Sequence, residues 1–110
     1  MKQLPKDDIE LIFVVLKERR HLLLSQGNGS IGDYITFFEG FFFSLRMCYD
    51  VDLERAISAW FQDRVTQKAP NMYWFAQFEY CYCEQEEETR TMLLLDTLEA
   101  FFVSYFDVKE

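Results

Sequence analysis

Residues 30–49 read SIGDYITFFEGFFFSLRMCY, and this stretch decides the fold class. Ser30 and Asp33 have the spacing of a capping box, in which the Ser hydroxyl accepts a backbone hydrogen bond and the acid reaches back. Apolar residues then recur at intervals of three and four, the period of a helix that is buried on one side. These residues are Ile31, Tyr34, Ile35, Phe38, Phe42, Leu45 and Tyr49. The stretch therefore predicts an amphipathic helix.

Two features of this helix call for an explanation. Gly40 costs a helix about 1 kcal/mol relative to Ala, so we expect a backbone or a ring to pack closely against it. Phe37, Phe41 and Phe43 fall outside the main apolar stripe, so the helix carries rings on two sides. Either the rest of the fold buries both sides, or a partner or a second copy of the chain covers one.

An N-terminal helix is predicted over about residues 5–25. Pro5 fits the first turn of a helix, where a missing N–H leaves no bond unmade. Asp7 and Asp8 follow where the helix dipole favours negative charge. Apolar residues continue at helical spacing until the turn-forming cluster at residues 26–29.

Two more helices are predicted further along the chain. Asp52 is the expected N-cap of a helix over about residues 53–68, which ends before Pro70 because the residue preceding a proline avoids helical geometry. The last helix, over residues 86–107, begins with acids in its first turn. Its predicted buried face consists of Leu94, Leu95, Leu98, Phe102, Tyr105 and Phe106.

Residues 72–83 read MYWFAQFEYCYC, and periodicity alone does not decide their structure. Every second residue from Trp74 to Tyr82 is apolar, as in a strand, but Phe75, Phe78 and Tyr82 also satisfy a helical stripe. We favour a helix, because no partner strand is evident and an isolated strand would leave its backbone groups unpaired. The resulting prediction is one all-α domain over residues 1–110, a compact bundle of about five helices.

The composition indicates a folded, acidic protein. Of the 110 residues, 50% are hydrophobic and 18% aromatic, and the net charge is −8. Residues 1–55 have a net charge of −2 and residues 56–110 a net charge of −6. Direct binding to nucleic acid requires a basic surface, so this class of function is not expected.

Three cysteines are too few for a disulfide framework, and an odd number cannot all pair with one another. We therefore expect reduced thiols, buried and inert at Cys81 and Cys83, and a cytoplasmic protein. The charged N-terminus has no apolar signal core, and the longest apolar stretch is too short to cross a membrane. No membrane association is predicted.

The sequence offers no evident catalytic or cofactor site. No phosphate-binding loop or nucleophile motif is present, and a di-metal bundle would need more than the single Glu18-x-x-His21. Glu79 and Glu84 flank Cys81 and Cys83 and disfavour thiolate formation. We predict a protein that is not an enzyme and that has neither a bound metal nor a cofactor.

A block of acids follows the aromatic run. Residues 79–110 contain nine acids against Arg90 and Lys109, more negative charge than the start of one helix requires. We expect a surface that docks on a basic protein, extended by Asp96 and Glu99, with nearby rings supplying the affinity. The predicted partner-binding residues are Glu79, Glu84, Glu86, Glu87, Glu88, Tyr80, Tyr82 and Trp74. The simpler alternative is that the acids only help the last helix to form.

In its overall character the chain resembles the immunity proteins of contact-dependent growth inhibition systems and of nuclease colicins. The acidic block and the ring-rich segment are the features on which this resemblance depends. The resemblance implies a bacterial inhibitor whose acids occupy the basic active cleft of a toxin domain. Glu84, Glu86, Glu87 and Glu88 would face basic residues of the toxin.

Three other classes of function stay open. The nearest is another acidic protein-binding module, such as a phage-encoded nucleic-acid mimic or a regulatory subunit. An enzyme with a site assembled from scattered acids is the next. A homodimeric structural protein would account for the excess of phenylalanine.

Overall fold

The computed structural model describes residues 4–19, 30–64 and 73–109. All regular secondary structure in these ranges is α-helical, which confirms the predicted all-α fold class. The helices are α1 (Lys6–Glu18), α2 (Ile31–Tyr49), α3 (Leu53–Gln62), α4 (Trp74–Cys81) and α5 (Glu87–Lys109). Residues 72–83 thus contain a helix, as we favoured, and no strand in their described part.

Two helices end earlier than their apolar periodicity predicts. α1 ends at Glu18, and Arg19 has left helical geometry with φ −141° and ψ 53°, so the predicted end near residue 25 is wrong. α3 ends at Gln62 and is followed by a turn at residues 63 and 64, before the predicted end near residue 68. Residues 20–29 and 65–72 lie outside the described part of the chain, and so does His21.

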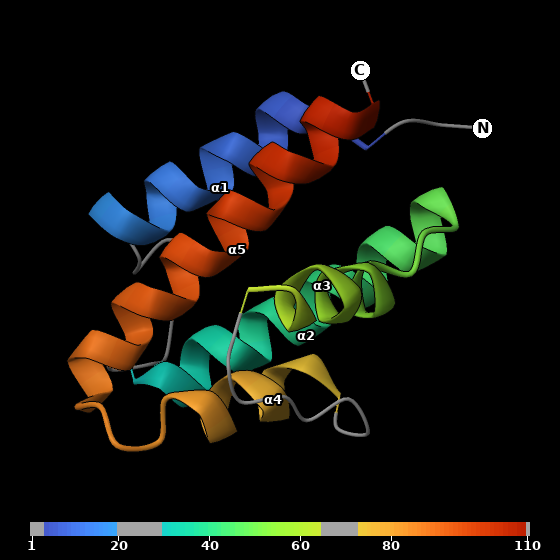
Figure 1. Cartoon of the computed structure of the whole chain (residues 1–110). Helices are drawn as coiled ribbons and strands as arrows, with labels where there is room; N and C mark the ends of the chain where they lie inside the picture. The colour runs from blue at the N-terminus through green and yellow to red at the C-terminus, as the bar shows by residue number, and fades with distance from the viewer. Residues whose placement is uncertain (1–3, 20–29, 65–72, 110) are drawn as a thin grey trace.

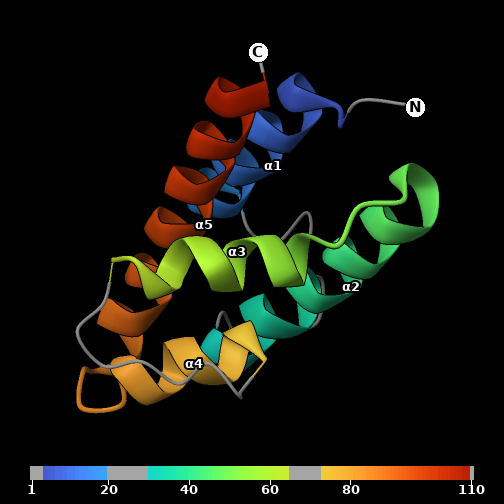
Figure 2. The same cartoon turned by 45° about the vertical axis from the view of Figure 1, so that its right-hand side comes forward.

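The five helices are held together mainly by α5 and α2. α5 packs against both α1 and α2, while α3 packs on α2 and α4 packs on α3. α1 and α5 run side by side in opposite directions, so that α1 begins near the place where α5 ends (Figures 1 and 2). The turn between α4 and α5 lies at the other end of the molecule. No helix in the described ranges combines the length and the apolar character needed to cross a bilayer.

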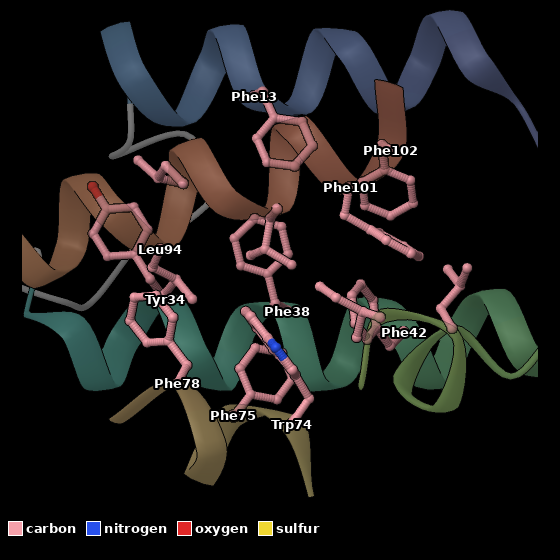
Figure 3. Packing of buried hydrophobic residues seen from close by; sticks show 14 of the residues in the cluster. Phe13, Tyr34, Phe38, Phe42, Trp74, Phe75, Phe78, Leu94, Phe101 and Phe102 are labelled. Carbon is pink, nitrogen blue, oxygen red and sulfur yellow. The ribbon is translucent and has the colours of Figure 1, made fainter. Parts of the chain in front are cut away.

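Phenylalanine rings form the contact between the three long helices (Figure 3). Phe13 of α1 stacks on Phe38 of α2 with ring centroids 5.7 Å apart and lies 5.9 Å from Phe102 of α5. Phe42 of α2 meets Phe102 edge-on at 6.1 Å. All four rings are buried, and such ring pairs contribute about 0.5–1.5 kcal/mol each beyond the area that they bury.

The predicted buried face of α5 is largely correct. Leu94, Leu95, Leu98, Phe102 and Phe106 are buried, and Tyr105 is half-buried. Phe101, which the predicted stripe omits, is also buried and contacts Trp60 of α3 at 5.6 Å. The apolar face of α5 is therefore wider than predicted, because α3 covers an additional side of this helix.

Polar contacts position α4, a helix of only eight residues. A helix this short is unstable by itself and depends on tertiary contacts. Glu54 of α3 accepts a hydrogen bond from the first backbone N–H of α4, at Trp74. Gln77, which is buried, donates from Nε2 to Ser58 Oγ at 2.7 Å and accepts from Gln62 Nε2. Three bonds from α3 thereby fix the position of α4.

α2 begins at the capping box that the sequence predicts. Ser30 Oγ accepts from the backbone N–H of Asp33 at 3.4 Å, and Asp33 Oδ2 accepts from the N–H of Ser30 at 3.3 Å. Off the main stripe, Phe37 and Phe41 are half-buried with their rings stacked at 6.0 Å, whereas Phe43 is 64% exposed. The fold therefore partly covers Phe37 and Phe41 and leaves Phe43 exposed to solvent.

Gly40 does not have the close neighbour that we expected. It is exposed, and a Cβ atom added at this position would meet nothing within 4 Å. The expectation of close packing is wrong, because this side of α2 faces outward.

Replacing Gly40 by alanine should stabilise the protein. We expect Gly40→Ala to raise the free energy of unfolding by about 0.5–1 kcal/mol, because alanine loses less backbone entropy and meets no obstacle. Urea unfolding followed by circular dichroism measures the change. Gly32→Ala, the same substitution at a second exposed glycine in the first turn of α2, serves as the control. Destabilisation by Gly40→Ala would mean that a close neighbour exists after all.

Lys17 connects the C-terminal turn of α1 to the middle of α5. Its Nζ lies 2.6 Å from Glu99 Oε1 and 3.4 Å from Asp96 Oδ1. The hydrogen bond to Glu99 is the main cause that raises the pKa of Lys17 above its ordinary value, although partial burial acts in the opposite direction.

The contribution of Lys17 to stability should disappear at high pH. We expect Lys17→Gln to lower the free energy of unfolding by up to about 1 kcal/mol near neutral pH, as exposed ion pairs do. Because folding raises its pKa, the contribution is complete below the ordinary value of 10.5 and is lost as pH rises through the raised pKa. Urea unfolding at pH 7 and at a pH above that value measures the difference. Arg55→Gln, at an exposed arginine of α3, serves as the control.

Candidate functional site

The acidic block lies at the junction of α4 and α5, at one end of the molecule (Figure 1). We call Glu84, Glu86, Glu87 and Glu88 the acidic turn. All four residues are exposed. Within the described residues, Glu84, Glu86 and Glu88 form no ion pair, so their charge is uncompensated at the surface.

Glu87 has a structural role. Its Oε2 accepts a hydrogen bond at 3.1 Å from the backbone N–H of Ile31, the first residue of α2. The first N–H groups of a helix have no partner within the helix, and a carboxylate there also interacts favourably with the helix dipole. Glu87 thus agrees with the simpler alternative, in which an acid of this block stabilises the start of a helix. It acts on the start of α2 and also lies in the first turn of α5.

Glu79 is also engaged within the protein. Its Oε2 lies 2.7 Å from Nη1 of Arg90, so the pair joins α4 to the first part of α5. The charge of Glu79 is thereby compensated. For this reason Glu79 contributes less to the negative surface than the sequence suggests.

Lys17 compensates the charge of Asp96 and Glu99 only in part. Both carboxylates lie within ion-pair distance of Lys17, and they share this one cation. One net negative charge remains at this pair, so its contribution to the expected patch is smaller than the sequence suggests.

Trp74, an expected partner-binding residue, belongs to the core. Its side chain is 0% exposed and meets the ring of Phe61 edge-on at 5.5 Å. It cannot contact a partner in this fold, so the expectation is wrong. The cause is that the first turn of α4 packs onto α3, which turns Trp74 inward and leaves the preceding Tyr73 55% exposed.

The two predicted tyrosines differ in exposure. Tyr80 is 52% exposed, whereas Tyr82 is half-buried with its ring 4.9 Å from that of Phe78. Tyr73 is the N-cap residue that precedes α4, and Tyr80 lies near the C-terminal end of this helix. The α4 segment therefore presents an exposed tyrosine at each of its ends, and the acidic turn follows the C-terminal one.

The cysteines give no sign of an activated thiol. Burial is the main cause that raises the pKa of the Cys81 thiol, and Cys83 adds to the effect. Cys81 is half-buried, but Cys83 is exposed, so the expected burial of Cys83 is wrong; Cys48 is exposed as well. No group of three or more His, Cys, Asp and Glu side chains in the described ranges is placed to hold a metal ion.

Comparison of the chain with protein-family models, with curated proteins and with solved structures finds no match.

The acids at the junction should separate into structural and solvated ones. We expect Glu87→Ala to lower the free energy of unfolding by about 1 kcal/mol more than Glu88→Ala does, because only Glu87 bonds the N–H of Ile31. Both residues lie in the first turn of α5, so the loss of helix-dipole interaction is matched. Thermal unfolding followed by circular dichroism measures the two effects. Equal effects would contradict the structural role of Glu87.

Proposed function

We propose that this protein is an inhibitor that binds a basic protein, and that it serves as the immunity protein of a toxin that cleaves nucleic acid. The observation that carries the proposal is the acidic turn. Three exposed carboxylates, at Glu84, Glu86 and Glu88, lie together beside an exposed tyrosine, and no described cation compensates them. The net charge of −8 strengthens the same field.

The charges and the rings would have different roles in binding. Long-range attraction between the acidic turn and a basic cleft speeds the encounter and suppresses wrong partners. Tyr73 and Tyr80 would then supply contact area, since tyrosines are frequent among the residues that dominate interface energies. A nuclease binds phosphates with basic side chains, so carboxylates at its cleft can occupy the positions of the substrate's charges.

A second candidate function uses the same surface. Another acidic protein-binding module, such as a phage-encoded nucleic-acid mimic or a regulatory subunit, would also present carboxylates beside rings. The two candidates differ in their partner, because an immunity protein must neutralise the toxin encoded with it.

Co-expression tests the proposal directly. The product of the gene immediately upstream is expressed in a sensitive bacterial strain, with and without this protein, and growth is measured. We expect the upstream product to stop growth and this protein to restore it, and the two should purify as a complex. A non-toxic upstream product, or growth that this protein does not restore, would contradict the immunity function.

Charge reversal tests the docking surface. The triple variant Glu84→Lys, Glu86→Lys and Glu88→Lys should slow association with the toxin by about tenfold or more at low salt, with a smaller effect at high salt. Asp7→Lys, Asp8→Lys and Glu10→Lys together provide the control, because these exposed acids of α1 give the same change in net charge at the other end of the molecule. Stopped-flow fluorescence measures both rates. Equal slowing by the two variants would place the interface elsewhere.

A further inference from the structure

A groove lies where α2 meets the starts of α3 and α4, and it is separate from the acidic turn. Its cavity volume is about 210 Å³. The floor is apolar and consists of Phe42, Leu53 and Phe75, all of them buried. Pockets that enclose drug-sized ligands measure about 300–1,000 Å³, so the size of this groove fits a single side chain better than a cofactor.

The rim of the groove carries more negative than positive charge. Glu39, Asp52 and Glu54 line it together with one cation, Arg46. Arg46 Nη1 lies 3.8 Å from Asp52 Oδ2, so this cation is already shared with a carboxylate. Glu54 accepts a hydrogen bond from the backbone of Trp74, which leaves its charge in place. Glu39 is exposed and forms no ion pair within the described residues.

Two exposed rings complete the rim. Phe43 is 64% exposed and Tyr73 is 55% exposed, and both line the groove. Within the described ranges, Phe43 belongs neither to the hydrophobic core nor to the half-buried residues packed against it. Large exposed rings beside a concave apolar surface are typical of a contact site.

Carboxylates beside aromatic faces are complementary to one side chain in particular. The guanidinium group of arginine is planar, stacks on aromatic rings and pairs with carboxylates, while its aliphatic stem can lie on an apolar floor. Lysine offers a compact charge without a flat face, so it matches the rings less well. We infer that this groove takes an arginine side chain of the basic protein partner.

The groove and the acidic turn can serve one partner. Tyr73 lines the groove at the start of α4, and Tyr80 lies near the acidic turn at its other end. α4 has eight residues. At 1.5 Å per residue its length is about 12 Å, well within the span of a protein interface of ordinary size. This inference rests on the proposed function for the existence of the partner, and the groove would supply the anchoring contact that the acidic turn lacks.

Titration with a small arginine probe tests the groove without the toxin. N-acetyl-L-arginine amide is added to the ¹⁵N-labelled protein, and N-acetyl-L-citrulline amide serves as its uncharged isostere. We expect saturable shifts of the backbone amide signals of Glu39, Phe43 and Tyr73 with arginine and much smaller shifts with citrulline. Equal shifts with the two compounds, or arginine-dependent shifts confined to the acidic turn, would overturn the inference.

Two variants make the test specific to the groove. Phe43→Ser removes an exposed ring, and Glu39→Gln removes a rim charge while keeping the shape of the side chain. Each should weaken binding of the arginine amide by about two- to fivefold, the loss of one exposed cation–π or ionic contact. Met92→Ser on α5, at a residue that is 56% exposed, is the control and should leave binding unchanged. Unchanged binding in both groove variants would refute the assignment.

The same variants distinguish the two proposals. In complex with the toxin, Phe43→Ser should accelerate dissociation, whereas charge reversal at the acidic turn slows association. If arginine amide binds the groove but the protein does not neutralise the upstream product, the proposed function fails and the groove assignment stands. If neutralisation and dissociation are unaffected by Phe43→Ser and Glu39→Gln, the groove assignment fails and the proposed function stands.

Discussion

The contact of phenylalanine rings between α5, α1 and α2 is the constraint on which the rest of the structure depends. Phe13, Phe38 and Phe102 come from three different helices and bury one another. Each ring removes roughly 150–250 Å² from water, so a chain of 110 residues can build a core from few side chains. α3 attaches to this framework through the contact of Trp60 with Phe101, and α4 through the contact of Phe75 with Phe42.

Local signals in the sequence were sufficient for helices and insufficient for their ends and contacts. The capping box of α2 was predictable because Ser30 and Asp33 act on each other within one turn. The end of α1 was not, because the apolar spacing continues past Glu18. Trp74 was assigned to the surface in error, since Tyr73 and Trp74 are adjacent rings and only packing on α3 decides which one faces inward. Among the acids, Glu87 could not be recognised as structural, because its partner Ile31 lies 56 residues away.

The carboxylates of this protein fall into two groups. The first group bonds the backbone or a cation of another element and holds the helices in place; its members are Glu54, Glu79, Glu87, Asp96 and Glu99. Carboxylates of the second group extend into solvent and make the surface negatively charged. A negatively charged protein repels copies of itself and most nucleic acid, and this bias restricts the set of partners before any specific contact is made. Composition therefore limits the partners, and the rings beside the charges would select among them.

The buried amide of Gln77 has a consequence for the two exposed tyrosines of the α4 segment. Its two hydrogen bonds to α3 would be lost if α4 slid or rotated by one residue, and an unpaired amide in a dry interior costs about 1–3 kcal/mol. These hydrogen bonds thus fix α4 in one register on α3. The same register fixes the backbone positions of Tyr73 and Tyr80. A partner would meet two phenol rings whose backbone is already immobilised, so little ordering entropy remains to be lost when the complex forms.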